Sequence, residues 1–317
     1  MYNALVDMYS KCGSMVDAIH VFDQMDRRDA ISFNAIISAC VQSGNDSLAL
    51  GFFNRMGNEG IKPDEVTFLC FLKSCNSIMD VEGGVKTHLH IVESGHELNR
   101  YIGSMLVDFY ARHGDMDSAY RCFNKILERD VVSWNAMIAG YANHGQSDDA
   151  LRIYTRLREE DIDPDEITFV NILNAFTGPL FLKHGREVHA HAIGVGKGSN
   201  VSVCNSLIDM YGECESLEDA VLVFAKLSNR NTISWNTLIA SYNNADHSQA
   251  AIKLFDMMRD EHAKPNEITF VSGLHACSLT GSLSEGRFMH SQLVSSGFDS
   301  EVRVQNTLID LYIRNEC

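Results

Sequence analysis

VVSWNAMIAGYANHG, residues 131–145, has two near copies in the same chain: AISFNAIISACVQSG at 30–44 and TISWNTLIASYNNAD at 232–246. The copies are 101 residues apart in both directions, with no insertion or deletion. Repetition at a fixed period indicates an array of structural units, each of which packs only on its neighbours. The fold of the chain therefore follows from the fold of one period.

The rarest residues of the chain obey the same period. Three of the four prolines and both tryptophans are 101 residues from an equivalent residue. Chance does not align rare residues in this way. The sets are Pro63, Pro164 and Pro265; Phe33, Trp134 and Trp235; Gly84, Gly185 and Gly286; and Gly95, Gly196 and Gly297.

The pattern inside one period is helical. Trp134, Met137, Ile138 and Tyr141 have the i, i+3, i+4, i+7 spacing of one buried helix face. Gly145 then interrupts the chain. Because no alternating strand pattern occurs, the sequence predicts an all-α fold.

A second helix is predicted directly after Gly145, in SDDALRIYTRLREE (147–160). Two aspartates precede its apolar residues, and carboxylates in a first turn suit the helix dipole. Its predicted buried residues are Ala150, Leu151, Tyr154 and Leu157. Each helical hairpin is called a motif below, and three motifs of 31, 35 and 35 residues fill one period. The array predicts 19 helices.

Composition limits the function classes. Apolar residues make up 45% and charged residues 21%, which is typical of a folded soluble chain, and no apolar run approaches the roughly 20 residues that span a membrane. Nine cysteines without a C-x-x-C pair indicate reduced thiols in an intracellular compartment. The net charge of −16 counts against a general affinity for nucleic acid, and no DNA partner is expected.

The motif lengths and endings resemble one known family. A short motif ends in ERD, the next ends in I-x-P-[DN] or AKPN, and the third carries HLHIVESG, HAHAIGVG or HSQLVSSG. Tetratricopeptide repeats keep a period of about 34 and a different signature. With VVSWNAMIAGYANHG and PDEITFVNILNAF, this arrangement resembles the pentatricopeptide repeat (PPR) family, in the PLS subclass that cycles P, L and S motifs.

The resemblance covers the whole chain and implies a right-handed α-α superhelix. MYNALVDMYSKCG, at the start, is already motif sequence without a targeting segment, so we expect a fragment of a longer protein. The predicted motifs are S 1–29, P 30–64, L 65–99, S 100–130, P 131–165, L 166–200, S 201–231, P 232–266, L 267–301 and a partial S 302–317.

A solenoid of this kind offers a groove lined by the first helices, which suits an extended partner such as a peptide or single-stranded nucleic acid. The resemblance implies RNA, with one base facing each motif. It also implies that the fifth and last residues of a motif read the base, while an aliphatic second residue stacks on it. An asparagine at the fifth position suits this role because an amide both donates and accepts hydrogen bonds.

The candidate base-reading pairs are Asn3 with Asp29, Asn34 with Asp64, Ser104 with Asp130, Asn135 with Asp165, Asn205 with Asn231, and Asn236 with Asn266, together with Asn306. The candidate stacking residues are Ile31, Val132 and Ile233. The alternative is that these asparagines are only turn or cap residues, which their recurrence inside a helix disfavours.

Some positions depart from the family pattern. The L motifs carry Leu69, Val170 and Val271 at the fifth position, which offer no hydrogen bonds, so we expect these motifs to act mainly as spacers. Ser202 and Arg303 replace the aliphatic second residue, which argues against stacking there.

No catalytic or metal-binding group is predicted. His88 and His90 form an H-x-H pair, but residues two apart on a helix point away from each other and chelate poorly. His88, His189 and His290 share one position of the period, which favours packing or an interhelical hydrogen bond. IGVGKGSN (193–200) lacks the strand and Lys-Ser/Thr of a phosphate loop and reads as a turn. No cofactor is expected.

The leading hypothesis is sequence-specific binding of single-stranded RNA. The resemblance further implies a mitochondrial or chloroplast protein that recognises sites for cytidine-to-uridine editing, with editing-complex proteins as further partners. The zinc deaminase signature is missing, so the chemistry would belong to a domain outside this sequence. The alternative is a helical scaffold for protein partners, which the acidic composition favours; the hypothesis of an enzyme has almost no support.

Overall fold

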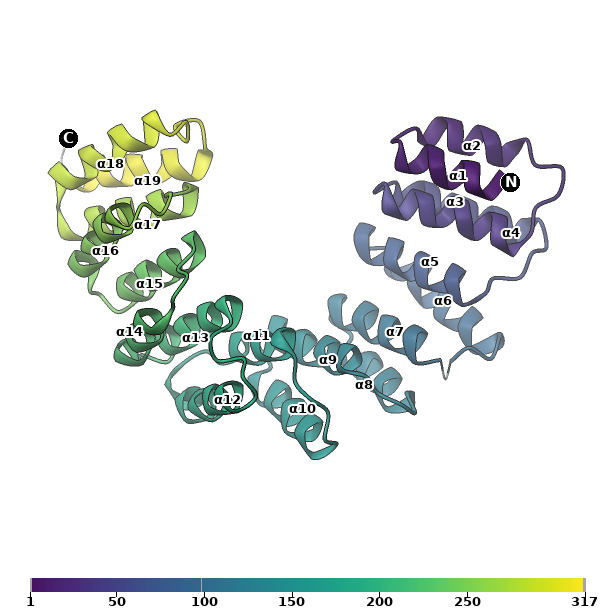
Figure 1. Cartoon of the computed structure of the whole chain (residues 1–317), viewed down its shortest axis with the longest axis horizontal. Coiled ribbons are helices and arrows are strands. Elements are labelled where there is room, and N and C mark those ends of the chain that lie inside the picture. Colours follow the sequence, from purple (N-terminus) through teal and green to yellow (C-terminus); the bar gives the residue numbers. More distant parts are fainter. Residues whose placement is uncertain (1, 98, 316–317) are drawn as a thin grey trace. The chain divides into compact units, whose positions relative to one another are not determined.

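The computed structural model describes residues 2–97 and 99–315, and this part of the chain contains 19 α-helices, one short 3-10 helix and no strand (Figure 1). The predicted all-α fold and helix count are confirmed. None of the described helices is long and apolar enough to cross a membrane.

The chain divides into two compact segments, and the boundary along the chain lies between Asp163 and Pro164. The N-terminal segment contains α1 (Tyr2–Lys11), α2 (Met15–Asp23), α3 (Ala30–Gln42), α4 (Asp46–Asn58), α5 (Glu65–Ile78), α6 (Val81–Glu93), α7 (Arg100–Arg112), α8 (Met116–Lys125), α9 (Val131–Asn143) and α10 (Ser147–Glu159).

The C-terminal segment contains α11 (Glu166–Asn174), the 3-10 helix η1 (Pro179–Phe181), α12 (Leu182–Gly194), α13 (Val201–Glu213), α14 (Leu217–Lys226), α15 (Thr232–Asn244), α16 (Ser248–Asp260), α17 (Glu267–Thr280), α18 (Leu283–Ser295) and α19 (Val302–Arg314). The sequence pattern did not predict η1, which begins at the one proline outside the period, Pro179.

Each segment is a stack of hairpins in two layers. The first helices of successive motifs pack on one another, α1 to α3 to α5 to α7 to α9 in one segment and α11 to α13 to α15 to α17 to α19 in the other. The second helices pack on the first helix of their own motif, and several also contact the first helix of the next. One face of each segment is therefore built from first helices, and it is called the first-helix face below.

The repeated aromatic residues form the core between motifs. Trp134 is fully buried and meets the ring of Phe123 edge to face at 4.7 Å. The same contact recurs one period away in both directions, between Phe33 and Phe22 at 5.0 Å and between Trp235 and Phe224 at 4.8 Å. Edge-to-face pairs of this kind stabilise beyond their burial, so each period is anchored at the same place.

An arginine covers one ring of each of these aromatic pairs. Arg129 lies over the ring of Phe123 at 4.9 Å, its Nε donates to the Phe123 carbonyl oxygen, and it forms an ion pair with Glu160. One side chain thus covers the ring, satisfies a carbonyl at the end of α8 and reaches the next motif. Arg28 and Arg230 do the same over Phe22 and Phe224, with Glu59 and Glu261 as ionic partners.

The buried face of the second helix is shifted slightly from the predicted one. Ala150, Tyr154 and Leu157 are buried as predicted, but Leu151 is only half-buried. Ile153 is buried instead, because the stripe at 150, 153, 154 and 157 has the helical spacing and Leu151 lies at its margin.

The shared histidine position has the role that the sequence favoured. His88 Nδ1 is hydrogen-bonded to Tyr110 Oη at 2.8 Å, which joins α6 to α7. His189 with Tyr211 and His290 with Tyr312 repeat the bond at 2.9 Å. The prediction of an interhelical hydrogen bond is confirmed.

Gly84, Gly185 and Gly286 recur because the second helix of each L motif closely approaches the next first helix. A Cβ atom at Gly84 would lie 2.1 Å from the ring of Phe109, which is fully buried. At Gly185 and Gly286 the nearest atoms would be Met210 Sδ at 2.4 Å and Leu311 Cδ2 at 2.7 Å. A side chain at any of the three positions would displace a core residue.

The substitution Gly84→Ala is expected to lower the free energy of unfolding by about 1–3 kcal/mol, because the aromatic ring has no free space to enter. Gly51→Ala is the matched control, since Gly51 lies inside α4 with nothing within 4 Å of its Cβ position. That control should raise stability by about 1 kcal/mol through helix propensity alone. Urea denaturation followed by circular dichroism measures both, and equal effects would contradict the close approach.

Candidate nucleic-acid interface

The last residue of a P or S motif is the N-cap of the next first helix. Asp64, for example, has extended backbone angles, and its carboxylate accepts the backbone N–H of Thr67 at 3.0 Å. Caps of this type satisfy a helix donor that has no partner in the helix. The caps and the residues whose N–H they accept are Asp29 with Ser32, Asp64 with Thr67, Asp130 with Ser133, Asp165 with Thr168, Asn231 with Ser234, and Asn266 with Thr269.

Asn34 and Asp64, a predicted base-reading pair, are in direct contact. The Asn34 amide nitrogen donates to both carboxylate oxygens of Asp64, at 2.8 and 2.9 Å. The hydroxyl of Thr67 donates to the Asn34 amide oxygen at 2.5 Å. The amide is therefore held on both sides, with its nitrogen toward the cap and its oxygen toward Thr67.

The same arrangement occurs in two further motifs. Asn236 donates to Asn266 Oδ1 at 3.0 Å, and Thr269 donates to Asn236 Oδ1 at 2.6 Å. Asn205 and Asn231 are joined by a longer contact of 3.5 Å, and Ser234 donates to Asn205 Oδ1 at 2.7 Å. The structure thus brings together three of the six predicted pairs, each with a third polar partner.

Each held amide keeps part of its hydrogen-bonding capacity. An asparagine side chain has two N–H donors and two lone pairs on oxygen. The cap uses one donor and the hydroxyl uses one lone pair, so one of each remains. Asn205 and Asn236 are 9% and 7% exposed, so little of either residue is accessible to a partner. The asparagines are inside helices and are neither turn nor cap residues.

The other predicted pairs differ. No hydrogen bond between described residues joins Asn3 to Asp29 or Ser104 to Asp130, and the Ser104 hydroxyl donates to the Arg100 carbonyl oxygen at 2.8 Å instead. Asn306 is exposed on α19, and its partner position lies outside the sequence. Asn135 is 7% exposed at the end of the N-terminal segment, and Asp165 belongs to the C-terminal segment, so their pairing stays a prediction.

The predicted stacking residues are apolar side chains in contact with solvent. Ile31 is 67% exposed, and Val132 and Ile233 are each 59% exposed, in the first turn of α3, α9 and α15. Burial against a flat partner would remove this apolar surface from water. The L motifs carry equivalent exposed residues, Val66, Ile167 and Ile268, which the prediction omitted although they occupy the same second position.

The residues that depart from the family pattern also lie on first helices. Leu69, Val170 and Val271 are half-buried on first helices, and Ser202 and Arg303 are exposed in first turns. None of the five offers the amide of a P motif.

Sequence reasoning missed the third residue of each following motif. Thr67, Ser234 and Thr269 are completely buried and touch the fifth residue of the preceding motif. The signal was present, since D-E-V-T, N-T-I-S and N-E-I-T each place a hydroxyl three residues after a cap. That spacing predicts a capping box but not the additional bond to an asparagine about 30 residues earlier.

Asp64 is electrostatically suited to remain ionised. Its partial burial acts to raise the pKa, but hydrogen bonds from the Thr67 backbone and the Asn34 amide outweigh that effect. The pKa of the Asp64 carboxyl therefore lies below its ordinary value. At neutral pH this position presents an acceptor and a negative charge.

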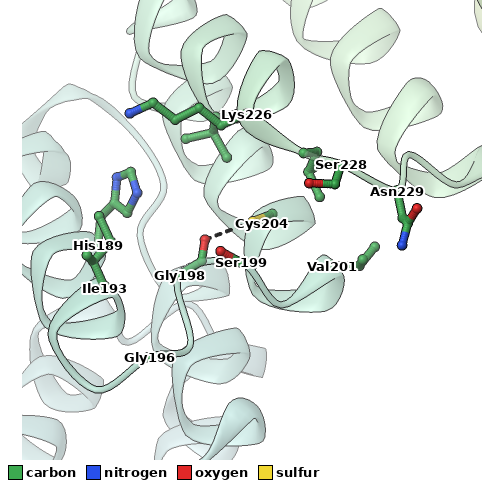
Figure 2. Close-up of a pocket in the computed structure, with 12 residues that line it drawn as sticks. His189, Ile193, Gly196, Gly198, Ser199, Val201, Cys204, Lys226, Ser228 and Asn229 are labelled. Atoms are coloured by element: carbon green, nitrogen blue, oxygen red, sulfur yellow. Dashed lines mark hydrogen bonds between the residues drawn. The ribbon is translucent and has the colours of Figure 1, made fainter.

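A pocket of about 310 Å³ lies between α12, α13, α14 and the loop 195–200, where the predicted turn is found (Figure 2). His189 lines it, and burial, followed by the charge of Lys226, lowers the pKa of this histidine. Cys204 Sγ donates to the Gly198 carbonyl oxygen at 3.3 Å, as the dashed line in Figure 2 shows. Both groups are thus engaged within the fold.

Lys226 is the one charged side chain among the described residues that line this pocket. It makes no ion pair with the described residues, because Gly198 stands where the preceding period has Glu97, the partner of Lys125. Among the described residues, this pocket offers one exposed ammonium, and its Cys204 and His189 are hydrogen-bonded to Gly198 and Tyr211 rather than to each other.

The thiols of the core are unreactive. Burial raises the pKa of Cys75 and of Cys277 to about 12, so neither is a thiolate at neutral pH. Both are fully buried at the position where the middle period has Phe176, as the sequence suggested. Among the described residues, no group of three or more His, Cys, Asp or Glu side chains is arranged to hold a metal ion.

Comparison with known proteins identifies the family. A model of the PPR repeat family matches residues 28–77, 129–178 and 230–278, and a model of the PPR repeat matches 1–29, 104–131 and 202–231. The chain belongs to the pentatricopeptide repeat family. Together the matches extend over well more than half of the sequence and recur at the 101-residue period.

Relatives from Arabidopsis thaliana match nearly the whole chain. The chloroplastic pentatricopeptide repeat-containing protein At1g15510 is 34% identical over 316 residues, which are 99% of this chain and 36% of the relative. The mitochondrial protein At3g02330 is also 34% identical, over 98% of this chain and 36% of its own length. The chain thus spans about a third of the length of these relatives, and their names agree with an organellar location.

Solved structures share the fold. The crystal structure of PPR10 from maize has a TM-score of 0.50 and 18% identity, over 99% of this chain and 51% of that one. The structure of PPR10 in complex with an 18-nt psaJ RNA element has a TM-score of 0.57 and 18% identity, over 98% and 52%. At this identity the likeness concerns the helical-repeat fold.

The substitution Asp64→Asn tests the hydrogen bonds around the cap. The lowered pKa means that ionised Asp64 stabilises the fold fully above about pH 4, and that this contribution disappears as pH falls through the folded-state pKa. Asparagine keeps the cap, as Asn266 does at the equivalent position two periods later, but its side chain does not titrate. Wild-type stability should therefore fall more steeply below pH 4 than that of the variant in acid-dependent thermal denaturation. Parallel pH profiles would contradict the network.

Proposed function

We propose that this protein binds single-stranded RNA in a sequence-specific manner through its first-helix face, with one base at each P and S motif. The observation that carries the proposal is the repeated polar pair, in which a buried or half-buried amide is held by a helix cap with one donor and one acceptor left over. An exposed aliphatic side chain lies three residues before that amide in every P motif. PPR10, which shares the fold, has been solved with an RNA element.

The last residue distinguishes U from C in this proposal. Asp64 accepts hydrogen bonds only, so it complements the N3–H donor of uracil. Asn266 uses its oxygen for the Thr269 backbone and for Asn236, so its own NH₂ group remains to donate to the N3 acceptor of cytosine. The pair Asn34–Asp64 therefore prefers U, and Asn236–Asn266 prefers C.

Ser104 with Asp130 suits guanine for a related reason. The Ser104 hydroxyl proton is used by the Arg100 carbonyl oxygen, so Ser104 Oγ can only accept. Asp130 is likewise an acceptor, and guanine presents two donors, N1–H and the N2 amino group, on its Watson–Crick edge. The short serine also leaves room for a purine, where asparagine does not.

The predicted RNA follows from these assignments along the chain. With the N-terminus toward the RNA 5′ end, as the family resemblance implies, the sequence reads U-U-x-G-U-x-C-C-x-pyrimidine, in which U can replace C. The L motifs are left unassigned because their fifth residues make no hydrogen bonds to a base.

The negative net charge does not contradict base recognition. The held amides are neutral, and many basic side chains are paired with carboxylates, such as Arg55 with Asp23 and Glu59. Phosphate contacts therefore contribute little, and the charge of −16 weakens binding at long range. Specificity comes from the bases.

The finer biological role is part of the same proposal. We infer an organellar transcript as the target and recognition of a cytidine-to-uridine editing site as the task, in the PLS subclass. A deaminase-like domain outside this sequence and editing-complex proteins would supply the chemistry. The alternative function, a scaffold for protein partners, is favoured only by the acidic composition.

Selection from randomised RNA oligonucleotides separates the two functions. Enrichment of the motif above supports RNA recognition, whereas binding without enrichment of any sequence, or no binding, supports the scaffold. The selection requires low salt, because weak affinity is expected from the acidic surface.

The sharpest single-residue test is Ser104→Asn. The new amide should change the preferred fourth base from G to U, because asparagine with Asp130 recreates the pair Asn34–Asp64. The expected change in relative affinity is about fivefold, corresponding to about 1 kcal/mol for one amide contact. Fluorescence anisotropy with RNAs that differ only at the fourth base measures it, and RNAs that differ at the second base are the control. Unchanged affinities for the G and U oligonucleotides would refute the one-motif-one-base model.

A further inference from the structure

The third residue of the following motif makes the shortest hydrogen bond to each held amide. A hydroxyl carries one proton, so it donates to one acceptor at a time. Thr67 Oγ1 is 2.5 Å from Asn34 Oδ1 but 2.9 Å from Asp64 Oδ1, and Thr269 Oγ1 is 2.6 Å from Asn236 Oδ1 but 2.9 Å from Asn266 Oδ1. The distances assign the proton to the asparagine in both motifs.

Ser234 and Ser133, one period apart, donate their hydroxyl protons to different acceptors. Both are completely buried third residues that follow a cap. Ser234 faces Asn205 and donates to its amide oxygen at 2.7 Å. Ser133 follows a motif whose fifth residue is Ser104, and it donates to the Asp130 carbonyl oxygen at 2.8 Å. Between these two motifs the hydroxyl reaches back to the fifth residue only where that residue is an amide, although Ser32, which follows Asn3, donates to the Asp29 carbonyl oxygen at 2.9 Å.

We propose that the buried third-position hydroxyls Thr67, Ser234 and Thr269 are positioning residues that fix which end of the base-reading amide faces the RNA. The proposal rests on the proposed function. Without the hydroxyl, an asparagine amide keeps only its contact with the cap and turns over more readily, which exchanges its exposed donor and acceptor. A held amide presents one fixed pattern to the base, and an amide that turns over accommodates either pyrimidine.

The cap alone does not fix the amide in the motifs with two asparagines. The Ser234 backbone N–H holds Asn231 Oδ1, which then attracts the Asn205 nitrogen, but that contact is long at 3.5 Å. The Ser234 hydroxyl is therefore the stronger of the two restraints on Asn205. After the first motif, Ser32 donates to the Asp29 carbonyl oxygen, and no described bond holds Asn3. The first base should accordingly be read less strictly than the second.

The first test needs no RNA. In Ser234→Ala, hydrogen exchange of the Asn205 side-chain NH₂ group, followed by NMR, should become faster than in the wild type, because the amide is free to turn. Ser133→Ala is the matched control: it removes the same type of buried capping hydroxyl one period away and should leave Asn205 unchanged. Ser234→Thr should restore the slow exchange. Equal exchange in the wild type and in Ser234→Ala overturns the proposal.

The second test measures base choice at the seventh position, which faces Asn205. RNAs with C or U there are titrated against wild type, Ser234→Ala, Ser234→Thr and Ser133→Ala. The preference for C should fall about fivefold in Ser234→Ala, as expected for one hydrogen bond, and persist in the other two variants. A preference equal to that of the wild type in Ser234→Ala overturns the proposal, and so does an equal loss in Ser133→Ala, because the role would then be only structural.

The two tests separate this proposal from the function on which it rests. If the wild type binds no RNA while Ser234→Ala accelerates exchange at Asn205, the restraint on the amide is supported and the proposed function fails. If the wild type discriminates between bases and exchange is unchanged, the proposed function stands and the positioning role fails. Thr67→Val, with Thr67→Ser as its conservative control, repeats the comparison at the second base.

Discussion

The side chain at the end of each P and S motif caps the next first helix, and this constraint connects the fold to the site. The cap requires an aspartate or asparagine in extended backbone geometry, directly before a helix. Because Asp64, Asn231 and Asn266 also hold the fifth residue of their own motifs, the spacing between these candidate readers is set by the stacking of first helices. A change in packing between motifs would move the readers with it.

The recurrence of the same packing contacts in each 101-residue period explains why the fold was predictable from the sequence in detail. Trp134 and Trp235 repeat because each packs on an aromatic ring of the preceding motif, and the histidines repeat because each bonds a tyrosine 22 residues later. These contacts lie within one period, so they leave a pattern in the sequence. The extra 3-10 helix at Pro179 and the burial of Ile153 were not predictable, because each depends on local features that the period does not constrain.

The candidate site was predictable only in part, for a different reason. The family resemblance supplied the fifth and last positions, and the structure joins Asn34 to Asp64 as that scheme requires. The third-position hydroxyl was not predicted, because its place three residues after a cap indicates only a capping box. Its second contact connects residues 33 positions apart in Thr67 and Asn34, and only the placement of two helices reveals it.

Positions that vary between periods indicate where packing imposes no requirement. Glu97 pairs with Lys125, yet one period later a glycine replaces the glutamate and the equivalent Lys226 has no ionic partner in the described part of the chain. The exposed ion pair is therefore dispensable, as the small energies of surface salt bridges imply.

The buried hydroxyls do not vary in this way, since every P and L motif follows a capped turn and has serine or threonine at its third position. A buried donor without a partner costs more than a surface ion pair provides, so each hydroxyl must find an acceptor. Where the preceding motif offers Asn34, Asn205 or Asn236, the hydroxyl donates to that amide. The same requirement that holds the helices together thereby orients the amides that we propose as base readers.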